Sequence, residues 1–208
     1  MGIWNSFHDE QTGSTDTDQF VSTWYEVDLY AGVTASTGRM SFDVFYTNYS
    51  SPNGAFGSIN ELGIGFGFHD NGLWGDSGFA LNPSATLAFE LGDNSGDGGA
   101  DKGVFLGIGV EPGMEISNTP VGDVAISFPV ELGLSLGDYY ELAGDDESFG
   151  YLSAGAAASV PLSFMPDGFG DWTLNTGVDF LLLGDHTENY NGGDDSEWIF
   201  HAGITLEF

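Results

Sequence analysis

The sequence has no cysteine and almost no basic residues, and both absences narrow its function. Without cysteine the chain can form no disulfide and offers no thiolate ligand or nucleophile. Only Arg39 and Lys102 are basic, against 32 acidic residues, which gives a formal net charge of -30. Phosphate binding needs Lys and Arg, so we exclude nucleic acid as a partner. A charge this large is typical of proteins adapted to high salt or to divalent cations, because self-repulsion must be screened.

Long apolar runs are missing as well. No continuous apolar stretch approaches the ~18 residues that a membrane-spanning helix needs. No signal peptide opens the chain, and residues 2–8 already have the composition of a strand. We therefore expect that a signal peptide has been removed, or that a longer N-terminal part, including a strand, is missing.

Apolar and polar residues alternate instead, most clearly in the last segment, residues 197–208. One face carries Trp198, Phe200, Ala202, Ile204, Leu206 and Phe208, and the other Ile199, His201, Gly203, Thr205 and Glu207. A period of two predicts a strand. A strand of about ten residues that ends on an aromatic residue is typical of bacterial transmembrane barrels. The last strand of a soluble β-sandwich would also alternate.

The same alternation recurs along the whole chain. We expect about ten strands at hairpin spacing, over residues 2–8, 24–33, 40–49, 61–69, 85–91, 104–110, 126–136, 152–162, 172–182 and 197–208. No amphipathic helix is predicted between them. The predicted fold class is all-β: a single domain over residues 1–208 that forms an up-and-down antiparallel transmembrane β-barrel. It has about ten visible strands, or about twelve with a missing N-terminal part.

The second face of these strands combines Gly, Ser and Thr with a carboxylate in nearly every strand. These carboxylates belong to Glu26, Asp28, Asp43, Glu61, Glu90, Glu111, Glu131, Asp179 and Glu207. In a soluble sandwich this face would meet water, where Lys and Arg should be common. In a membrane barrel it lines the lumen while the apolar face contacts lipid. We therefore predict that the nine carboxylates line a lumen, and that residues such as Ile204 face outward.

The expected connections divide into two sets. If the C-terminus lies on the periplasmic side, the outer loops are residues 183–196, 137–149, 92–102, 50–58 and 9–20. The inner loops are then residues 163–171, 111–123, 69–83 and 34–39. The Asp-rich runs fall in the outer set, and the inner set is less charged. This asymmetry is typical of a barrel whose long loops face outside.

Three N-terminal segments resemble a known family. Gly2–Ser6, Tyr25–Gly32 and Met40–Tyr46 are similar to consecutive strands of the TorF-type family of outer-membrane β-barrel proteins, a local likeness over about residues 2–50. The resemblance implies an outer-membrane location and a barrel of about twelve strands, without an established chemistry. The chain departs from the family in two ways. Family members usually have at least one more strand before the Trp-containing one, and their acidic excess is smaller.

Residues 93–101 have the spacing of the first half of a calcium loop. Asp93, Ser95, Asp97 and Asp101 surround Gly98 and offer oxygen ligands of the kind that Ca²⁺ prefers. Val104 occupies the position where an EF-hand has its bidentate Glu, so the loop is not an EF-hand. A solvated acidic hairpin loop is the alternative, and no other cofactor is indicated.

Catalytic motifs are absent from the sequence. The pairs His8-Asp9 and Asp185-His186 resemble the rim of omptin barrel proteases, but omptins are considerably longer.

We predict that the protein is not an enzyme. We expect a porin-like bacterial outer-membrane protein, either a small cation-selective pore or a structural envelope protein. Its partners would be the lipid bilayer and inorganic cations, and the sequence leaves open whether the chain forms a homo-oligomer. The alternative is a secreted, salt-adapted β-sandwich that binds calcium or self-assembles.

A barrel needs closure, because it has no free edges. We expect the last strand to pair with the first one present, near residues 2–8, or with a missing segment.

Overall fold

The computed structural model describes residues 1–8, 23–75, 79–96, 101–164, 168 and 170–207. It confirms an all-β protein with a many-stranded antiparallel sheet. The strands are β1 (Gly2–Phe7), β2 (Trp24–Thr37), β3 (Met40–Ser50), β4 (Ile59–Phe68), β5 (Ser84–Leu91), β6 (Val104–Val110), β7 (Gly113–Thr119), β8 (Gly122–Ser127), β9 (Val130–Gly137), β10 (Glu141–Leu142), β11 (Asp145–Asp146), β12 (Phe149–Pro161), β13 (Asp171–Leu183) and β14 (Ser196–Glu207). One short helix, α1 (Asp185–Tyr190), precedes β14. Within the described ranges no helix is long and apolar enough to cross a membrane.

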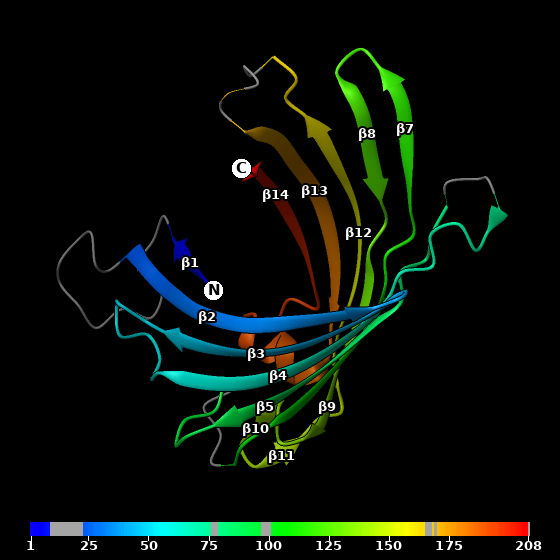
Figure 1. Cartoon of the computed structure of the whole chain (residues 1–208). Helices are drawn as coiled ribbons and strands as arrows, with labels where there is room; N and C mark the ends of the chain where they lie inside the picture. The colour runs from blue at the N-terminus through cyan, green and yellow to red at the C-terminus, as the bar shows by residue number, and fades with distance from the viewer. Residues whose placement is uncertain (9–22, 76–78, 97–100, 165–167, 169, 208) are drawn as a thin grey trace. The chain divides into compact units, whose positions relative to one another are not determined.

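Consecutive strands pair along most of the chain, as a meander requires (Figure 1). The hydrogen-bonded order is β1-β2-β3-β4-β5-β6-β9-β12-β13-β14, with β7 and β8 attached through β12. A two-residue turn, Gly38 and Arg39, joins β2 to β3, with Gly38 at φ 59°. In this order β1 pairs with β2 and β14 with β13, and the described residues include no pairing that closes the sheet into a barrel. The expected pairing of the last strand with the first stays a prediction.

The sequence prediction was wrong around residues 111–136. The expected connection 111–123 contains β7 and most of the hairpin that it forms with β8. The single strand expected over residues 126–136 is two strands, β8 and β9, separated at Phe128 and Pro129. Proline has no N–H to donate to a sheet, so a strand is readily interrupted there. The Pro129 carbonyl still accepts a hydrogen bond from the Gly155 N–H at 2.8 Å.

The chain forms two compact units. The first unit comprises Met1–Phe66, Ala85–Leu106 and Leu134–Phe149, and the second comprises Gly67–Ser84, Gly107–Gly133 and Gly150–Phe208. Residues of β4, β5, β6, β9 and β12 occur in both sets, because the boundaries fall within these strands rather than in linkers.

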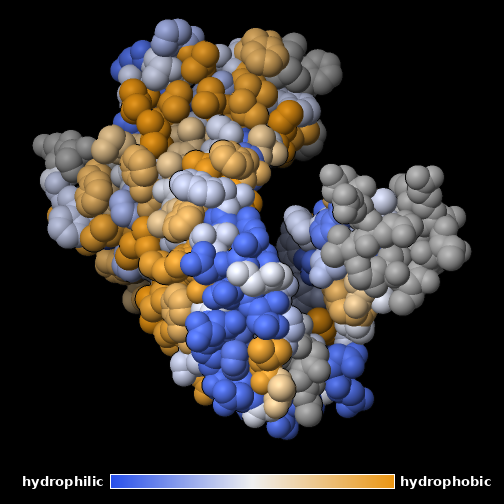
Figure 2. Space-filling model, turned by 180° about the vertical axis from the view of Figure 1, so that it is seen from behind, coloured by the Kyte–Doolittle hydropathy of each residue, from blue (hydrophilic) through white to orange (hydrophobic). Residues whose placement is uncertain are grey.

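Burial is inverted relative to a water-soluble protein. Among the described residues, the buried hydrophobic ones are Ile59, Ala80 and Ala88. The buried polar residues are Thr47, Asn53, Glu61, Asp70, Glu90, Ser95, Ser135 and Glu141. Large apolar side chains are exposed along the strands instead, and Figure 2 shows hydrophobic residues covering much of the visible surface. An exposed apolar area this extensive marks a surface that meets another apolar medium or a partner.

Glycines on the polar face make room for rings on neighbouring strands. A Cβ atom at Gly63 in β4 would overlap the phenyl ring of Phe45 in β3. Within the second unit, a Cβ atom at Gly177 in β13 would lie 2.5 Å from the imidazole of His201 in β14. Only glycine leaves space for such a ring to lie flat over the strand. Bulky side chains can therefore occupy this face without separating the strands.

A buried carboxylate organises the connection between β4 and β5 in the second unit. Asp70, only 4% exposed, accepts hydrogen bonds from the indole N–H of Trp74 at 2.6 Å and from the backbone N–H groups of Leu81 at 2.8 Å and Asn82 at 2.9 Å. Burial raises the pKa of Asp70, but these hydrogen bonds to the ionised form outweigh burial and lower the pKa below its ordinary value. The connection is thus held by a charge-assisted network.

Candidate functional site

The register of β2 and β3 separates an apolar from a polar face. Val33 lies opposite Val44, and the adjacent pair on the other face is Thr34 and Asp43. The Thr34 hydroxyl donates a hydrogen bond to an Asp43 carboxylate oxygen at 2.5 Å. A slip of one residue would exchange the two faces, so this register fixes where the acidic residues lie.

The nine predicted lumen carboxylates are divided between the two units. Glu26, Asp28, Asp43, Glu61 and Glu90 belong to the first unit, and Glu111, Glu131, Asp179 and Glu207 to the second. Glu61 and Glu90 are buried, whereas Glu111, Glu131 and Glu207 are exposed. The structure brings three of the nine, Glu26, Glu61 and Glu90, to the wall of one cavity, and their place in a lumen stays a prediction.

This cavity lies within the first unit and has a volume of about 350 Å³. Besides the three carboxylates, its wall contains Tyr25, Tyr49, Ala55, Phe56, Ile59, Gly96 and Tyr139. β2, β3, β4 and β5 each contribute at least one side chain, and Tyr139 comes from the connection between β9 and β10. We call this set the acidic–aromatic cavity. No Lys or Arg is among the described residues that line it.

Two phenols hold the carboxylate of Glu61. The hydroxyl of Tyr49 donates to Oε2 at 2.7 Å, and the hydroxyl of Tyr139 donates to Oε1 at 2.8 Å. Burial raises the pKa of Tyr139, and the neighbouring Glu61 carboxylate raises it further, so this phenol keeps its proton well above neutral pH. Glu61, only 5% exposed, therefore has a donor on each oxygen.

Backbone donors hold the carboxylate of Glu90. The N–H of Gly103 donates to Oε2 at 2.7 Å, and the N–H of Gly96 donates to Oε1. Because Gly96 and Gly103 lie on either side of residues 97–102, Glu90 connects the two ends of the acidic connection that follows β5. The third carboxylate, Glu26, interacts with the carboxyl group of Asp28 next to it on the same face of β2.

Aromatic rings complete the wall. The rings of Tyr25 and Phe56 meet edge to face, with centroids 5.6 Å apart and an interplanar angle of 66°. The imidazole of His8, which follows β1, stacks on the ring of Tyr25 with centroids 4.4 Å apart. The edge-to-face arrangement is one that the quadrupoles of aromatic rings favour. The cavity thus presents aromatic surface next to carboxylates.

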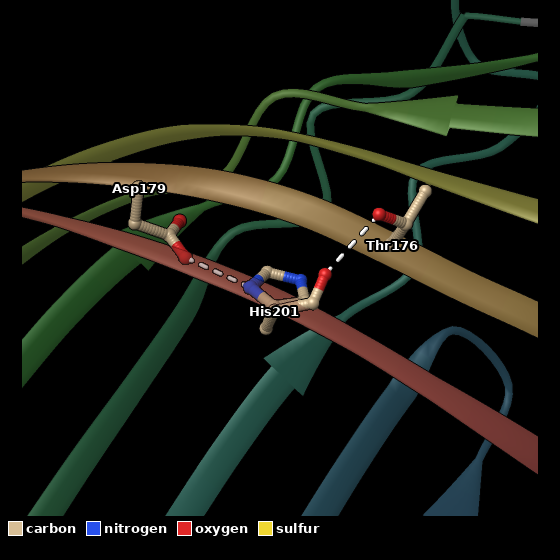
Figure 3. A network of polar contacts seen from close by, with 3 residues as sticks. All are labelled: Thr176, Asp179 and His201. Carbon is tan, nitrogen blue, oxygen red and sulfur yellow. Dashed lines mark hydrogen bonds and ion pairs between the residues drawn. The ribbon is translucent and has the colours of Figure 1, made fainter. Parts of the chain in front are cut away.

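The second unit holds a separate polar network on β13 and β14 (Figure 3). Nδ1 of His201 lies 3.3 Å from Oδ2 of Asp179, and the Thr176 hydroxyl donates to the His201 carbonyl oxygen at 3.2 Å. Elsewhere in this unit, Glu131 accepts a hydrogen bond from the Tyr151 hydroxyl at 2.5 Å. Glu207 lies opposite Asp171 at the far end of β14.

The predicted calcium loop is only partly described. Asp93 and Asp101 are exposed and Ser95 is buried, while Asp97 and Gly98 lie outside the described residues. Among the residues that are described, no group of three or more His, Cys, Asp or Glu side chains is placed to hold a metal ion. The calcium site stays a prediction.

Sequence reasoning missed the aromatic part of the cavity. Tyr49 has the odd-numbered parity of Asp43 and so belongs to the polar face of β3, which a strict alternation count could have found. Alternation would place Tyr25 on the face of β2 opposite to that of Glu26, yet both residues line the cavity. Tyr139 and Phe56 lie in connections, where no period predicts the direction of a side chain.

Comparisons with known proteins identify no relative: no protein-family model, no curated protein and no solved structure matches the chain.

Proposed function

We propose that the chain is an outer-membrane β-barrel protein whose acidic interior favours cations over anions. The burial carries this proposal, because eight polar or charged residues but only three apolar ones are buried among the described residues, while many large apolar side chains of the strands are exposed. Exposing one large apolar side chain to water instead of burying it costs about 1.5–3 kcal/mol. A chain that repeats this along many strands gains stability when lipid covers the apolar face.

Strand length supports the same proposal. A strand that crosses a bilayer needs about 9–11 residues. β3 has 11 residues, β4 has 10 and β14 has 12, while β2, β12 and β13 are longer still. The local resemblance of residues 2–50 to the TorF-type family agrees with this location.

The charge on the polar face supports cation preference. Carboxylates that line a water-filled pore attract cations and repel anions. The chain has only two basic residues against 32 acidic ones, so salt bridges cannot cancel this charge. If side chains fill the interior, the same protein is a structural envelope protein without conductance.

Detergent dependence tests the membrane part of the proposal. We expect the purified chain to be monodisperse in detergent and to aggregate when detergent is removed, and to insert into phosphatidylcholine vesicles. A chain that is monodisperse in concentrated salt without detergent would contradict the proposal. That result would favour a secreted, salt-adapted β-sandwich.

Single-channel recording tests the cation preference. In an asymmetric KCl gradient across a planar bilayer, we expect a reversal potential that indicates selectivity for K⁺. A reversal potential that favours chloride would overturn this part of the proposal, and the absence of conductance would favour a structural barrel. Melting in Ca²⁺ and in EDTA tests the calcium loop, because a bound ion raises the melting midpoint.

Closure is tested by cross-linking. A membrane barrel cannot leave β1 and β14 as free edges. Cysteine pairs placed at Trp4 and Gly203, and at neighbouring registers, should form a disulfide in the membrane if these strands pair. If no register cross-links, a segment or a partner chain must complete the barrel.

A further inference from the structure

The acidic–aromatic cavity of the first unit has the properties of a small-molecule site. Its volume of about 350 Å³ lies within the range of ~300–1,000 Å³ in which small ligands bind. Its wall combines apolar rings with a few polar groups held in fixed positions, which is the usual composition of such sites. All lining residues belong to one compact unit, so the cavity is defined by that unit alone.

The hydrogen bonds define the charge of the cavity. Glu61 accepts a bond on each oxygen, from two phenols, and Glu90 accepts a bond on each oxygen, from two backbone N–H groups. An ionised carboxylate accepts hydrogen bonds on both oxygens, so these four donors suit the ionised form of each group. Neutral donors hold them in place without cancelling their negative charge.

The aromatic rings add a second attraction for positive charge. Four rings, those of Tyr25, Tyr49, Phe56 and Tyr139, line the cavity. The face of an aromatic ring attracts a cation, and rings grouped around a cavity recognise quaternary ammonium groups. The ring pair of Tyr25 and Phe56 forms part of this surface.

We infer that this cavity binds an organic ammonium ion. Three observations favour an organic cation over a metal ion. The cavity is large enough for several non-hydrogen atoms, much of its wall is aromatic, and the buried carboxylate oxygens already accept O–H or N–H donors. Ca²⁺ would need six to eight oxygen ligands at about 2.3–2.6 Å, a different kind of site. A neutral ligand of the same shape would leave the negative charge uncompensated.

Calorimetric titration with choline tests this inference on the full chain. The neutral control is the alcohol in which carbon replaces the quaternary nitrogen of choline, because it has the same shape without the charge. We expect choline to bind with a stoichiometry of one, and the neutral alcohol to bind at least about tenfold more weakly. The chain is kept in whichever of detergent or salt solution leaves it monodisperse, so the outcome is independent of the membrane proposal.

Two substitutions test the contributions of the negative charge and of the aromatic rings separately. Glu61→Gln removes a charge and keeps an oxygen acceptor, and Phe56→Leu removes a ring and keeps apolar volume. Each should weaken choline binding by about tenfold. Glu131→Gln is the matched control, because Glu131 also accepts a tyrosine hydroxyl but lies in the second unit, outside the cavity. It should leave choline binding unchanged.

Four outcomes would overturn the inference. The first two are that the native chain does not bind choline, or that it binds choline and the neutral alcohol equally well. The other two are that Glu61→Gln and Glu131→Gln weaken choline binding equally, or that Ca²⁺ binds to the same carboxylates and displaces choline. Circular dichroism and the melting midpoint of each variant show whether it is folded. If Glu61→Gln fails to fold, Phe56→Leu decides the test, because Phe56 lies in the connection between β3 and β4 rather than in a strand.

Discussion

Placing an arginine at the centre of the apolar face gives the sharpest test of the membrane proposal. On β3 this face begins next to Arg39 and ends at Asn48, a span of nine residues. At ~3.3 Å per residue the span is about 30 Å long. A strand tilt of about 40° reduces it to roughly 23 Å along the bilayer normal, close to the ~25 Å apolar band of outer-membrane barrels. Val44 lies near the middle of this span.

Val44→Arg should therefore place a charge near the bilayer centre. Val44 is 47% exposed and lies opposite Val33, which is 74% exposed, so the substitution fills no core. We expect a cost of about 2–4 kcal/mol in the free energy of folding into phosphatidylcholine vesicles. Met40→Arg is the matched control, because Met40 is 39% exposed on the same face but lies beside the turn. Its cost should be about 0–1 kcal/mol.

Urea titration in the presence of vesicles, followed by tryptophan fluorescence, measures both costs. If water covers this face, both substitutions are ordinary surface changes, and each should stay within about 0.5 kcal/mol of the native chain. Equal costs at Val44 and Met40 would therefore refute the depth argument. A second pair repeats the test on β14, where Ile204→Arg should be costly and Thr205→Arg, on the other face, much less so.

Three further substitutions test the polar side of the sheet. Gly63→Ala should lower stability by about 1–3 kcal/mol, because its methyl group would overlap a ring on the neighbouring strand, whereas Gly203→Ala meets open space and should be nearly neutral in thermal melting. Tyr139→Phe leaves a buried carboxylate oxygen without its donor and should cost about 1–3 kcal/mol, while Tyr151→Phe, at an exposed carboxylate, should cost less in urea titration. Hydrogen bonds lower the pKa of Asp70 in the folded chain. The ionised Asp70 therefore contributes fully to the free energy of unfolding above its unfolded pKa of about 3.9, and this contribution is lost as the pH falls through the lower pKa of the folded chain. Asp70→Asn should remove this part of the acid dependence of the urea midpoint.

Alternation predicted the strands well because it is a local property of the chain. A half-buried strand repeats every two residues whatever its partner, so β2 and β3 could be found without knowing that Val33 lies opposite Val44. Alternation does not predict where a strand ends when the end is set by a change of the neighbouring strand with which it pairs. Alternation continues through Pro129, but the chain changes partners there, and β7 and β8 form a hairpin of their own. The alternation of the sequence gives no sign of this change of pairing partner.

The candidate site was predictable only in part, for the same reason. Alternation assigned Glu61 and Glu90 to the polar face, and both are buried there. It did not indicate that these two, rather than Glu131 or Glu207, share a cavity, because strand register and the path of the connections decide which side chains meet. Tyr139 lies 78 residues from Glu61 along the chain and reaches it from a connection.

The partners of the buried carboxylates connect the charge of the chain with its proposed function. Phenols and backbone N–H groups hydrogen-bond to Glu61 and Glu90, in a chain that has only two basic residues. Such donors compensate much of the cost of removing a carboxylate from water, because a buried acceptor chiefly needs a hydrogen bond. A lysine or arginine would do the same but would also cancel the charge. Neutral donors permit burial and leave the negative potential intact, and this is the physical basis for proposing that the polar face attracts small cations and that the acidic–aromatic cavity binds an organic one.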